Sequence, residues 1–267
     1  MSVRQDAEGR RLVSLEVEVP GTPEQVWQAM ATGPGVSAWF VPTQIEERVG
    51  GTLHFAMGPG MESAGTVTEW SPPHRFAYEE RDWATHAPPL ATEVTIEARA
   101  GGTCTVRMVH SLFASGDDWD DQLESFEAGW PGFFEVLRLY VRHHAGRPSA
   151  IVQASATITG TVEDGWTALH RALGFDDEPT EGSAVEMSEA GPALHGVVAA
   201  TRAGRERACI VRVTDPQPGT ASFGAFAWDD KVMLSLSLYF YGPHAEAAAA
   251  DAQPQWQAWM DAVAQQI

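Results

Sequence analysis

Residues 12–51 read LVSLEVEVPGTPEQVWQAMATGPGVSAWFVPTQIEERVGG, and this stretch decides the fold. Apolar and polar residues alternate along its first part, which predicts a half-buried strand. The apolar positions of that strand are Val13, Leu15, Val17 and Val19. The strand is expected to stop at Pro20-Gly21, because these two residue types favour a turn.

An amphipathic helix is expected directly after this turn. Thr22 can cap it, Pro23 suits its first turn, and Gln25 stands where it can complete a capping box. The apolar face of the helix is formed by Val26, Trp27 and Met30. The aromatic pair Trp39-Phe40 then leads into Val49-Gly50-Gly51 and a run of strands. This order of elements predicts a cupped antiparallel sheet built around a cavity.

The composition excludes several kinds of partner. The chain has 267 residues, enough for one large domain or two of ordinary size. Its 17 basic and 36 acidic residues give a net charge of −19. Nucleic acids and anionic lipids both attract Lys and Arg, so we expect no nucleic-acid partner and no membrane partner.

The sequence also points to a cytoplasmic protein. Its N-terminal residues lack the apolar core of a signal peptide, and no uncharged apolar run is long enough to span a bilayer. Cys104 and Cys209 lie far apart in strand-like segments. We therefore expect both to be buried, reduced thiols.

Further strands are expected after Gly51, at 52–57, 64–70, 74–82, 91–100 and 103–112. Turn signals separate them at 58–60, 71–73 and 101–102. The last strand carries an apolar face formed by Cys104, Val106, Met108, His110 and Leu112. One apolar and one polar face are typical of an antiparallel sheet that is covered on a single side.

The segment from Asp117 to His144 is expected to be the cover of that sheet. Its apolar residues recur at spacings of three and four, as on one face of a helix. They are Leu123, Phe126, Trp130, Phe133, Leu137 and Tyr140. Pro131 lacks a backbone donor, so it is expected to kink the helix or split it in two.

The pattern begins again after a linker at 146–150. The sequence GTVEDGWTA at 160–168 matches GTPEQVWQA at 21–29 with an offset of 139 residues. Gly51, Gly60 and Gly65 then correspond to Gly182, Gly191 and Gly196 with an offset of 131. The eight missing residues fall where Trp39-Phe40 would be. We interpret this as an internal duplication.

As a set, these motifs resemble the activator-of-heat-shock-protein-ATPase homologue family of the SRPBCC, or START-like, superfamily. The resemblance covers residues 10–145 and rests on Pro23 to Trp27, Trp39-Phe40, Val49 to Gly51, the strand and turn from Gly65 to Pro73, Thr105 to His110, and Gly129-Trp130. It implies an α+β helix-grip fold, in which a curved antiparallel sheet wraps around a long C-terminal helix and encloses an apolar cavity. The family includes ligand carriers and polyketide cyclases. Residues 151–267 resemble the same fold only through the repeat.

The expected ligand-binding residues lie on the inner sheet face and on the covering helix. They are Phe76, Tyr78, Trp83, Met108, His110, Phe126, Trp130, Phe133 and Leu137. His110 is also a weak candidate for a general base, although no nucleophile or carboxylate is visibly placed beside it. Plain core packing is the alternative interpretation of all these residues. No metal-ligand motif is present, so we expect no metal and no cofactor.

Three functions remain open. The first is non-enzymatic binding of a small apolar or aromatic ligand in the START-like cavity. The second is a cyclase- or hydrolase-like enzyme that uses His110 in the same cavity, which requires a second polar group within reach. The third, implied by the family name, is a co-chaperone that activates a heat-shock protein ATPase. A separate N-terminal domain carries chaperone binding in the eukaryotic activators, whereas about ten residues precede the first strand here. A protein partner or a homodimer is compatible with all three.

The second half is expected to be a shortened helix-grip unit without ligand space. Trp166 should lie on its first helix, and Trp256 and Trp259 on its closing helix. Its inner strand residues should be Val211, Val213, Leu234, Leu236, Leu238 and Phe240. Because protein interiors close-pack, the loss of one wall should make these side chains collapse inward.

Overall fold

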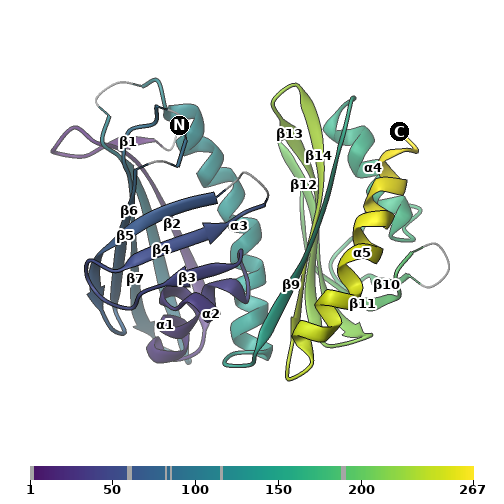
Figure 1. The fold of residues 1–267 in the computed structure, drawn as a ribbon, viewed down its shortest axis with the longest axis horizontal. Helices are drawn as coiled ribbons and strands as arrows, with labels where there is room; N and C mark the ends of the chain where they lie inside the picture. Colours follow the sequence, from purple (N-terminus) through teal and green to yellow (C-terminus); the bar gives the residue numbers. More distant parts are fainter. Residues whose placement is uncertain (1–2, 59–61, 82, 85, 115–116, 188–190) are drawn as a thin grey trace. The chain divides into compact units, whose positions relative to one another are not determined.

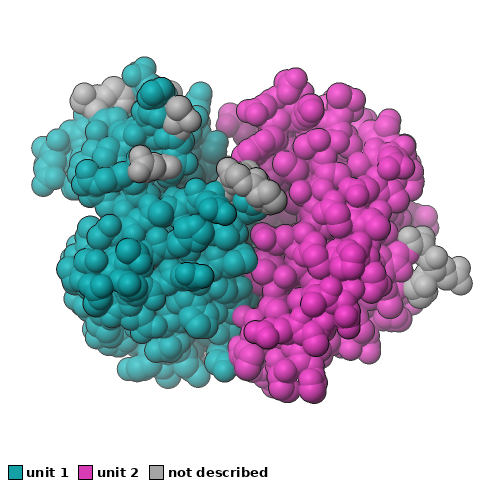
Figure 2. Space-filling view, viewed as in Figure 1, with its two compact units in different colours: residues 1–146 teal, residues 147–267 magenta. Residues whose placement is uncertain are grey.

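The structure, a computed structural model, describes residues 3–58, 62–81, 83–84, 86–114, 117–187 and 191–267. The chain divides into two compact units, residues 1–146 and 147–267 (Figure 2). Parts of two predicted elements lie outside the described residues: Pro59 and Gly60 of the first turn, and Asp82 at the end of a strand. Each unit is described separately.

Unit 1 contains a sheet of eight described strands in the order β1-β2-β8-β7-β6-β5-β4-β3, and all neighbours are antiparallel (Figure 1). The strands are β1 Arg4–Gln5, β2 Arg11–Pro20, β3 Thr43–Ile45, β4 Thr52–Ala56, β5 Glu62–Ser71, β6 Arg75–Glu80, β7 Leu90–Arg99 and β8 Thr103–Leu112. The helices are α1 Pro23–Ala31, α2 Gly33–Ser37 and α3 Asp120–His143. Alternation predicted six of these strands. It missed β1 and β3, which are too short to show a period.

The predicted turn from β2 into α1 is confirmed. The backbone N–H of Gln25 donates to the Thr22 hydroxyl at 3.4 Å, and the backbone N–H of Thr22 donates to the Gln25 side chain at 3.0 Å. These two bonds form the expected capping box. The apolar face of α1 is buried, including Val26, Trp27 and Met30.

Of the two effects predicted for Pro131, a kink or a split, the split does not occur, because α3 runs unbroken from Asp120 to His143. A proline removes only one backbone hydrogen bond, and tertiary packing can hold a helix together across it. Buried side chains stand on both sides of Pro131, with Leu123 before it and Leu137 and Tyr140 after it. Phe126, Trp130 and Phe133 are only half-buried.

Unit 2 repeats this arrangement with fewer elements. Its sheet has six described strands in the order β10-β11-β12-β13-β14-β9. They are β9 Ser149–Ile158, β10 Ala184–Met187, β11 Leu194–Arg202, β12 Glu206–Asp215, β13 Gly219–Trp228 and β14 Lys231–Tyr241, with helices α4 Val162–Ala172 and α5 Ala245–Ala264. The strand before the first helix pairs with the last strand in both units, β2 with β8 and β9 with β14. The residues that correspond to β1, α2 and β3 are missing from unit 2.

The pairing confirms the duplication and corrects its alignment by one residue. In unit 1, Gly50 N–H donates to Val67 O, and Val67 N–H donates to Gly51 O, both at 2.8 Å. In unit 2, Gly182 and Ser183 make the same two bonds with Val198, both at 2.9 Å. Gly182 therefore corresponds to Gly50, not to Gly51. Val67 and Val198 each lie at an irregularity in strand pairing, so even this local feature is shared.

The predicted inner residues of unit 2 form its apolar core. All six predicted inner residues from Val211 to Phe240 are buried. Trp166 on α4 and both Trp256 and Trp259 on α5 are buried in the same cluster as Phe223. Strand β9 begins at Ser149, so the last two residues of the predicted linker belong to that strand. Both cysteines are buried free thiols.

Candidate functional site

Two cross-strand rows of side chains form the middle of the inner sheet face in unit 1. Register places Phe76, Val94 and Met108 in one row across β6, β7 and β8. The next row contains Tyr78, Thr92 and His110. We call them the apolar row and the polar row. All of these residues are buried. A row of three polar side chains beside an apolar row is the kind of arrangement that orients a bound molecule.

His110 is the most constrained member of the polar row. Its Nδ1 is hydrogen-bonded to the Thr92 hydroxyl at 2.9 Å, and its ring stacks on Trp130 with centroids 5.6 Å apart. Its Nε2 has no hydrogen-bond partner among the described residues, and the side chain is buried. Burial lowers the pKa of His110 to about 4, so the imidazole is neutral at pH 7.

Glu80 extends this polar region toward the end of the sheet, and the sequence analysis missed it. It ends β6 and is buried, with an exposed fraction of 6%. Its carboxyl group accepts a hydrogen bond from the buried Ser63 hydroxyl. Burial raises the pKa of Glu80 to about 7, while the Ser63 hydrogen bond acts in the opposite direction. The sequence did contain a signal for it, because Phe76, Tyr78 and Glu80 follow one another at spacings of two residues along the strand. Side chains at this spacing point to the same face of a sheet.

Tyr78 lies between these groups. Burial raises its pKa far above the usual value, and the nearby Glu80 carboxylate adds to the rise, whereas a hydrogen bond with Thr92 lowers it. The carboxylate of Glu80 acts on Tyr78, whereas burial is the cause of the lowered pKa of His110. Burial moves the pKa values of Glu80 and His110 in opposite directions. Such displaced pairs are typical of sites that bind or transfer protons.

A small cavity lies beside the apolar row. Its volume is about 20 Å³, about enough for one water molecule. The lining residues are Met30, Val36, Trp39, Phe40, Ile45, Phe55, Phe76, Tyr78, Val94, Met108 and Trp130. Phe40 closes it by contacting Trp130 and Phe133, with ring centroids 4.9 and 4.8 Å away. The interior is therefore filled by aromatic side chains.

The predicted ligand-binding residues occupy different parts of this region. Phe76, Tyr78, Met108 and Trp130 line the cavity. His110 and Phe126 contact each other beside Trp130, and Phe126 also contacts Trp83. Phe133 packs on Phe40, while Leu137 is buried on α3 but does not line the cavity. The sequence analysis did not include Trp39 and Phe40 in the site, although it had noted the pair.

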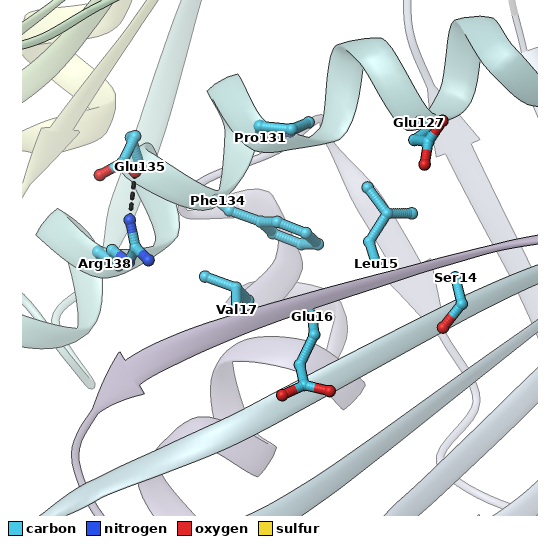
Figure 3. Close-up of a pocket in the computed structure, with 9 residues that line it drawn as sticks. All are labelled: Ser14, Leu15, Glu16, Val17, Glu127, Pro131, Phe134, Glu135 and Arg138. Carbon is cyan, nitrogen blue, oxygen red and sulfur yellow. Dashed lines mark hydrogen bonds and ion pairs between the residues drawn. The ribbon is translucent and has the colours of Figure 1, made fainter. Parts of the chain in front are cut away.

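A larger hollow lies elsewhere in unit 1, between β2 and α3 (Figure 3). Its volume is about 310 Å³. The lining residues are Ser14, Leu15, Glu16, Val17, Glu127, Pro131, Phe134, Glu135 and Arg138. Arg138 pairs with Glu135 and donates to the backbone carbonyl of Glu18 at 2.9 Å. This groove is rich in charged groups, unlike the cavity lined by aromatic side chains.

Unit 2 provides an internal comparison for the site. Strand register aligns the polar row of Tyr78, Thr92 and His110 with Val211, Ala221 and Leu238. The same alignment pairs Glu80 with Val213 and Ser63 with Leu194. All five residues in unit 2 are buried and apolar. The repeated fold therefore does not require polar groups at these positions, which singles them out in unit 1.

Metal ligands and membrane-spanning segments give no further site. Among the described residues, no cluster of His, Cys, Asp or Glu side chains could hold a metal ion. None of the helices that the structure describes has the length and apolar character needed to cross a bilayer.

The architecture defines the class of protein. Each unit is a helix-grip domain, an antiparallel sheet with a long closing helix, and the chain is a tandem of two. Residues 20–142 match the family described as "Activator of Hsp90 ATPase homolog 1-like protein". These residues lie within unit 1, so it is unit 1 that matches the family model. No curated protein matches this chain in sequence.

Solved structures with low sequence identity also resemble this chain. DynU16, a protein in the dynemicin biosynthetic locus, is 16% identical over 95% of this chain and 98% of its own, with a TM-score of 0.44. The di-domain ARO/CYC protein BexL from the BE-7585A biosynthetic pathway is 13% identical over 95% of this chain and 98% of its own, with a TM-score of 0.46. The Aha1 dimer from Colwellia psychrerythraea is 20% identical over 49% of this chain and 96% of its own, with a TM-score of 0.41.

Proposed function

We propose that unit 1 binds a small apolar or aromatic ligand between the inner sheet face and α3, without catalysing a reaction. The observation that carries this proposal is the contrast between the two interiors. At equivalent positions, unit 1 keeps five buried polar residues where unit 2 has apolar ones. Buried polar groups lower stability unless they are well paired, and the Nε2 atom of His110 has no partner among the described residues. A ligand that accepts or donates a hydrogen bond there offsets this loss.

Binding requires the aromatic wall to move, because the cavity of about 20 Å³ is too small for any organic ligand. Phe40, Trp130 and Phe133 are half-buried, so they can rotate outward more easily than fully buried rings. The open form is then a minor state that the ligand selects, and the observed affinity falls in proportion to its population.

Thermal shift with a panel of polyketides, lipids and aromatic metabolites tests the proposal. A ligand at a hundred times its dissociation constant stabilises the folded protein by about 2.7 kcal/mol. For a domain of this size, the melting temperature should rise by roughly 2–8 °C. Trp130→Ala should remove the shift, whereas Trp228→Ala, which changes an exposed tryptophan of unit 2, should leave it unchanged. A panel without any shift contradicts the proposal.

A second candidate function is acid–base catalysis in the same interior. The specific observation in its favour is that one sheet face carries both a neutral imidazole, His110, and a carboxyl group that is half-protonated near pH 7, Glu80. A neutral imidazole can accept a proton from a substrate, and a protonated carboxyl group can donate one. If this is correct, His110→Gln should abolish conversion of a bound ligand while ligand binding persists. A ligand that binds and stays chemically unchanged supports the first function.

A further inference from the structure

Glu80 lacks the partner that a buried carboxylate normally has. Of the residues classed as buried in the described part of the chain, it is the only acidic one, and none is Lys or Arg. Buried charges are usually paired with a charge of opposite sign. Ser63 donates one hydrogen bond to Glu80, but no ion pair joins Glu80 to a described basic side chain. The corresponding residue of unit 2 is Val213.

Among the described residues, no basic side chain forms an ion pair with Glu80, and Arg11, the basic residue of its cross-strand row, is paired with Asp120 of α3. Tyr78 on its own strand and Cys104 and His110 on β8 are the other titratable groups of that face, and His110 is neutral. On β5 and β7, Glu62 and Glu93 interact with His54 and Arg75 on the outer face. Arg81, next in sequence, is exposed and pairs with Glu79. Helix α3 presents the aromatic ring of Phe126 on this side, in contact with His110 and Trp83.

We infer that Glu80 recognises a basic nitrogen of the ligand, so that unit 1 takes an apolar or aromatic amine whose ammonium group pairs with the Glu80 carboxylate. This inference rests on the proposed function and names the class of ligand. The ammonium group supplies the missing counter-charge. Ser63 binds Oε1 and orients the carboxyl group, so the second oxygen can accept a hydrogen bond from the ligand.

Two further features favour a cation. Trp83, Trp119 and Phe126 form an aromatic cluster near the same end of the sheet, with centroids 5.5 and 5.6 Å apart around Trp83. Aromatic faces attract cations by about 0.5–2 kcal/mol. The net charge of −19 also attracts cationic molecules over a longer range. An anionic ligand would meet repulsion from both the carboxylate and the overall charge.

The inference predicts a direction for the pH dependence. An ammonium group binds the ionised form of Glu80, whose pKa is about 7 in the free protein. Binding should therefore strengthen by about tenfold between pH 6 and pH 8, because the ionised fraction rises by about that factor. If Glu80 instead donates a proton to a ligand carbonyl, binding should strengthen as the pH falls. The two roles of Glu80 thus give opposite slopes.

Competition binding on the full chain tests this inference. N-phenyl-1-naphthylamine, a non-basic fluorescent probe of apolar sites, serves as the reporter. It is displaced at pH 6, 7 and 8 by 1-naphthylmethylamine, which stays protonated in this range, or by the neutral 1-naphthylmethanol. We expect the amine to bind more tightly than the alcohol at pH 8. The affinity of the amine should be about tenfold lower at pH 6 than at pH 8. The alcohol should show no such slope.

Variants separate recognition from folding. Glu80→Gln should remove the preference for the amine and its pH slope while the reporter still binds. Glu79→Gln changes the neighbouring residue, which pairs with Arg81. This variant should keep the preference for the amine and the pH slope. Ser63→Ala retains the carboxyl group but removes the hydrogen bond that lowers its pKa, so the pH profile should shift upward. This variant keeps the test valid if Glu80→Gln does not fold.

Each outcome has a separate meaning. Equal competition by the amine and the alcohol at pH 8, or a preference that survives in Glu80→Gln, overturns the inference and leaves the proposed function standing. A slope in the opposite direction assigns Glu80 as a proton donor and overturns it as well. A reporter that does not bind the wild-type chain contradicts the proposed function itself.

Discussion

The interiors of the two units differ much more than their backbones. Both have the same order of the six strands that they share, a capping box at the first helix and the same pair of hydrogen bonds at Val67 and Val198. Inside, however, Tyr78, Thr92 and His110 of unit 1 face the same way as Val211, Ala221 and Leu238 of unit 2. A duplicated fold can thus keep its scaffold while only one copy keeps the polar groups that a ligand site needs.

The largest effect should come from placing a polar residue of unit 1 in unit 2. Leu238→His puts an imidazole where the neighbouring residue is Ala221, which cannot supply the hydrogen bond that Thr92 gives to His110. Burying an unpaired polar group and losing apolar contacts should destabilise unit 2 by about 3–5 kcal/mol. Urea unfolding of the full chain measures this loss. A loss below about 1 kcal/mol would mean that the interior of unit 2 is less closely packed than described.

Glu80 should make unit 1 less stable as the pH rises. Its pKa is about 7 in the folded protein and 4.5 when unfolded, so the folded state binds the proton more tightly. Its contribution is fully present below pH 4.5 and is lost as the pH rises through about 7, by an amount on the order of 3 kcal/mol. Urea unfolding at pH 4.5 and pH 8 should show this trend in the wild type relative to Glu80→Gln. Identical trends in the two proteins would show that Glu80 is well solvated.

His110 should act in the opposite direction. Its folded pKa of about 4 lies below the unfolded value of 6.5, so the unfolded state binds the proton more tightly. Stability should fall as the pH drops from 6.5 to 4, again by an amount on the order of 3 kcal/mol. His110→Leu installs the residue of unit 2 and should remove this acid sensitivity. An unchanged acid profile in the variant would argue against a neutral, buried His110.

The smallest effects should be equal in the two units. Thr22 and Thr161 cap α1 and α4 through the same pair of hydrogen bonds. Substitution of either residue by alanine should destabilise its own unit by about 1 kcal/mol. Hydrogen exchange of the two helices measures each loss separately. Clearly unequal losses would show that the two turns are not energetically equivalent.

Much of the fold could be predicted from alternation and caps, because these signals are local. Alternation placed His110 on the inner face of β8, the capping residues identified α1, and the internal repeat identified α4. Glu80 was missed because its phase with Phe76 and Tyr78 was not followed to the end of β6. The relative positions of Glu80, Thr92 and His110 depend on register across β6, β7 and β8, which alternation within one strand does not specify.

Other features depend on packing and could not be predicted. Pro131 is a local signal for a break, yet tertiary contacts on both sides keep α3 continuous. An apolar cavity was expected, but its volume depends on how Phe40 and Trp130 fill the space. No spacing in the sequence reports such side-chain positions. The groove between β2 and α3 was missed for the same reason.

The central claim is that the ligand binds in the interior of unit 1. A crystal structure of the full chain with the ligand that gives the largest thermal shift tests it most directly. We predict ligand density between the polar and apolar rows and α3, with Phe40 and Trp130 rotated away from their present contact. The interior of unit 2 should hold no ligand. Density in unit 2, or only in the groove between β2 and α3, would contradict the account.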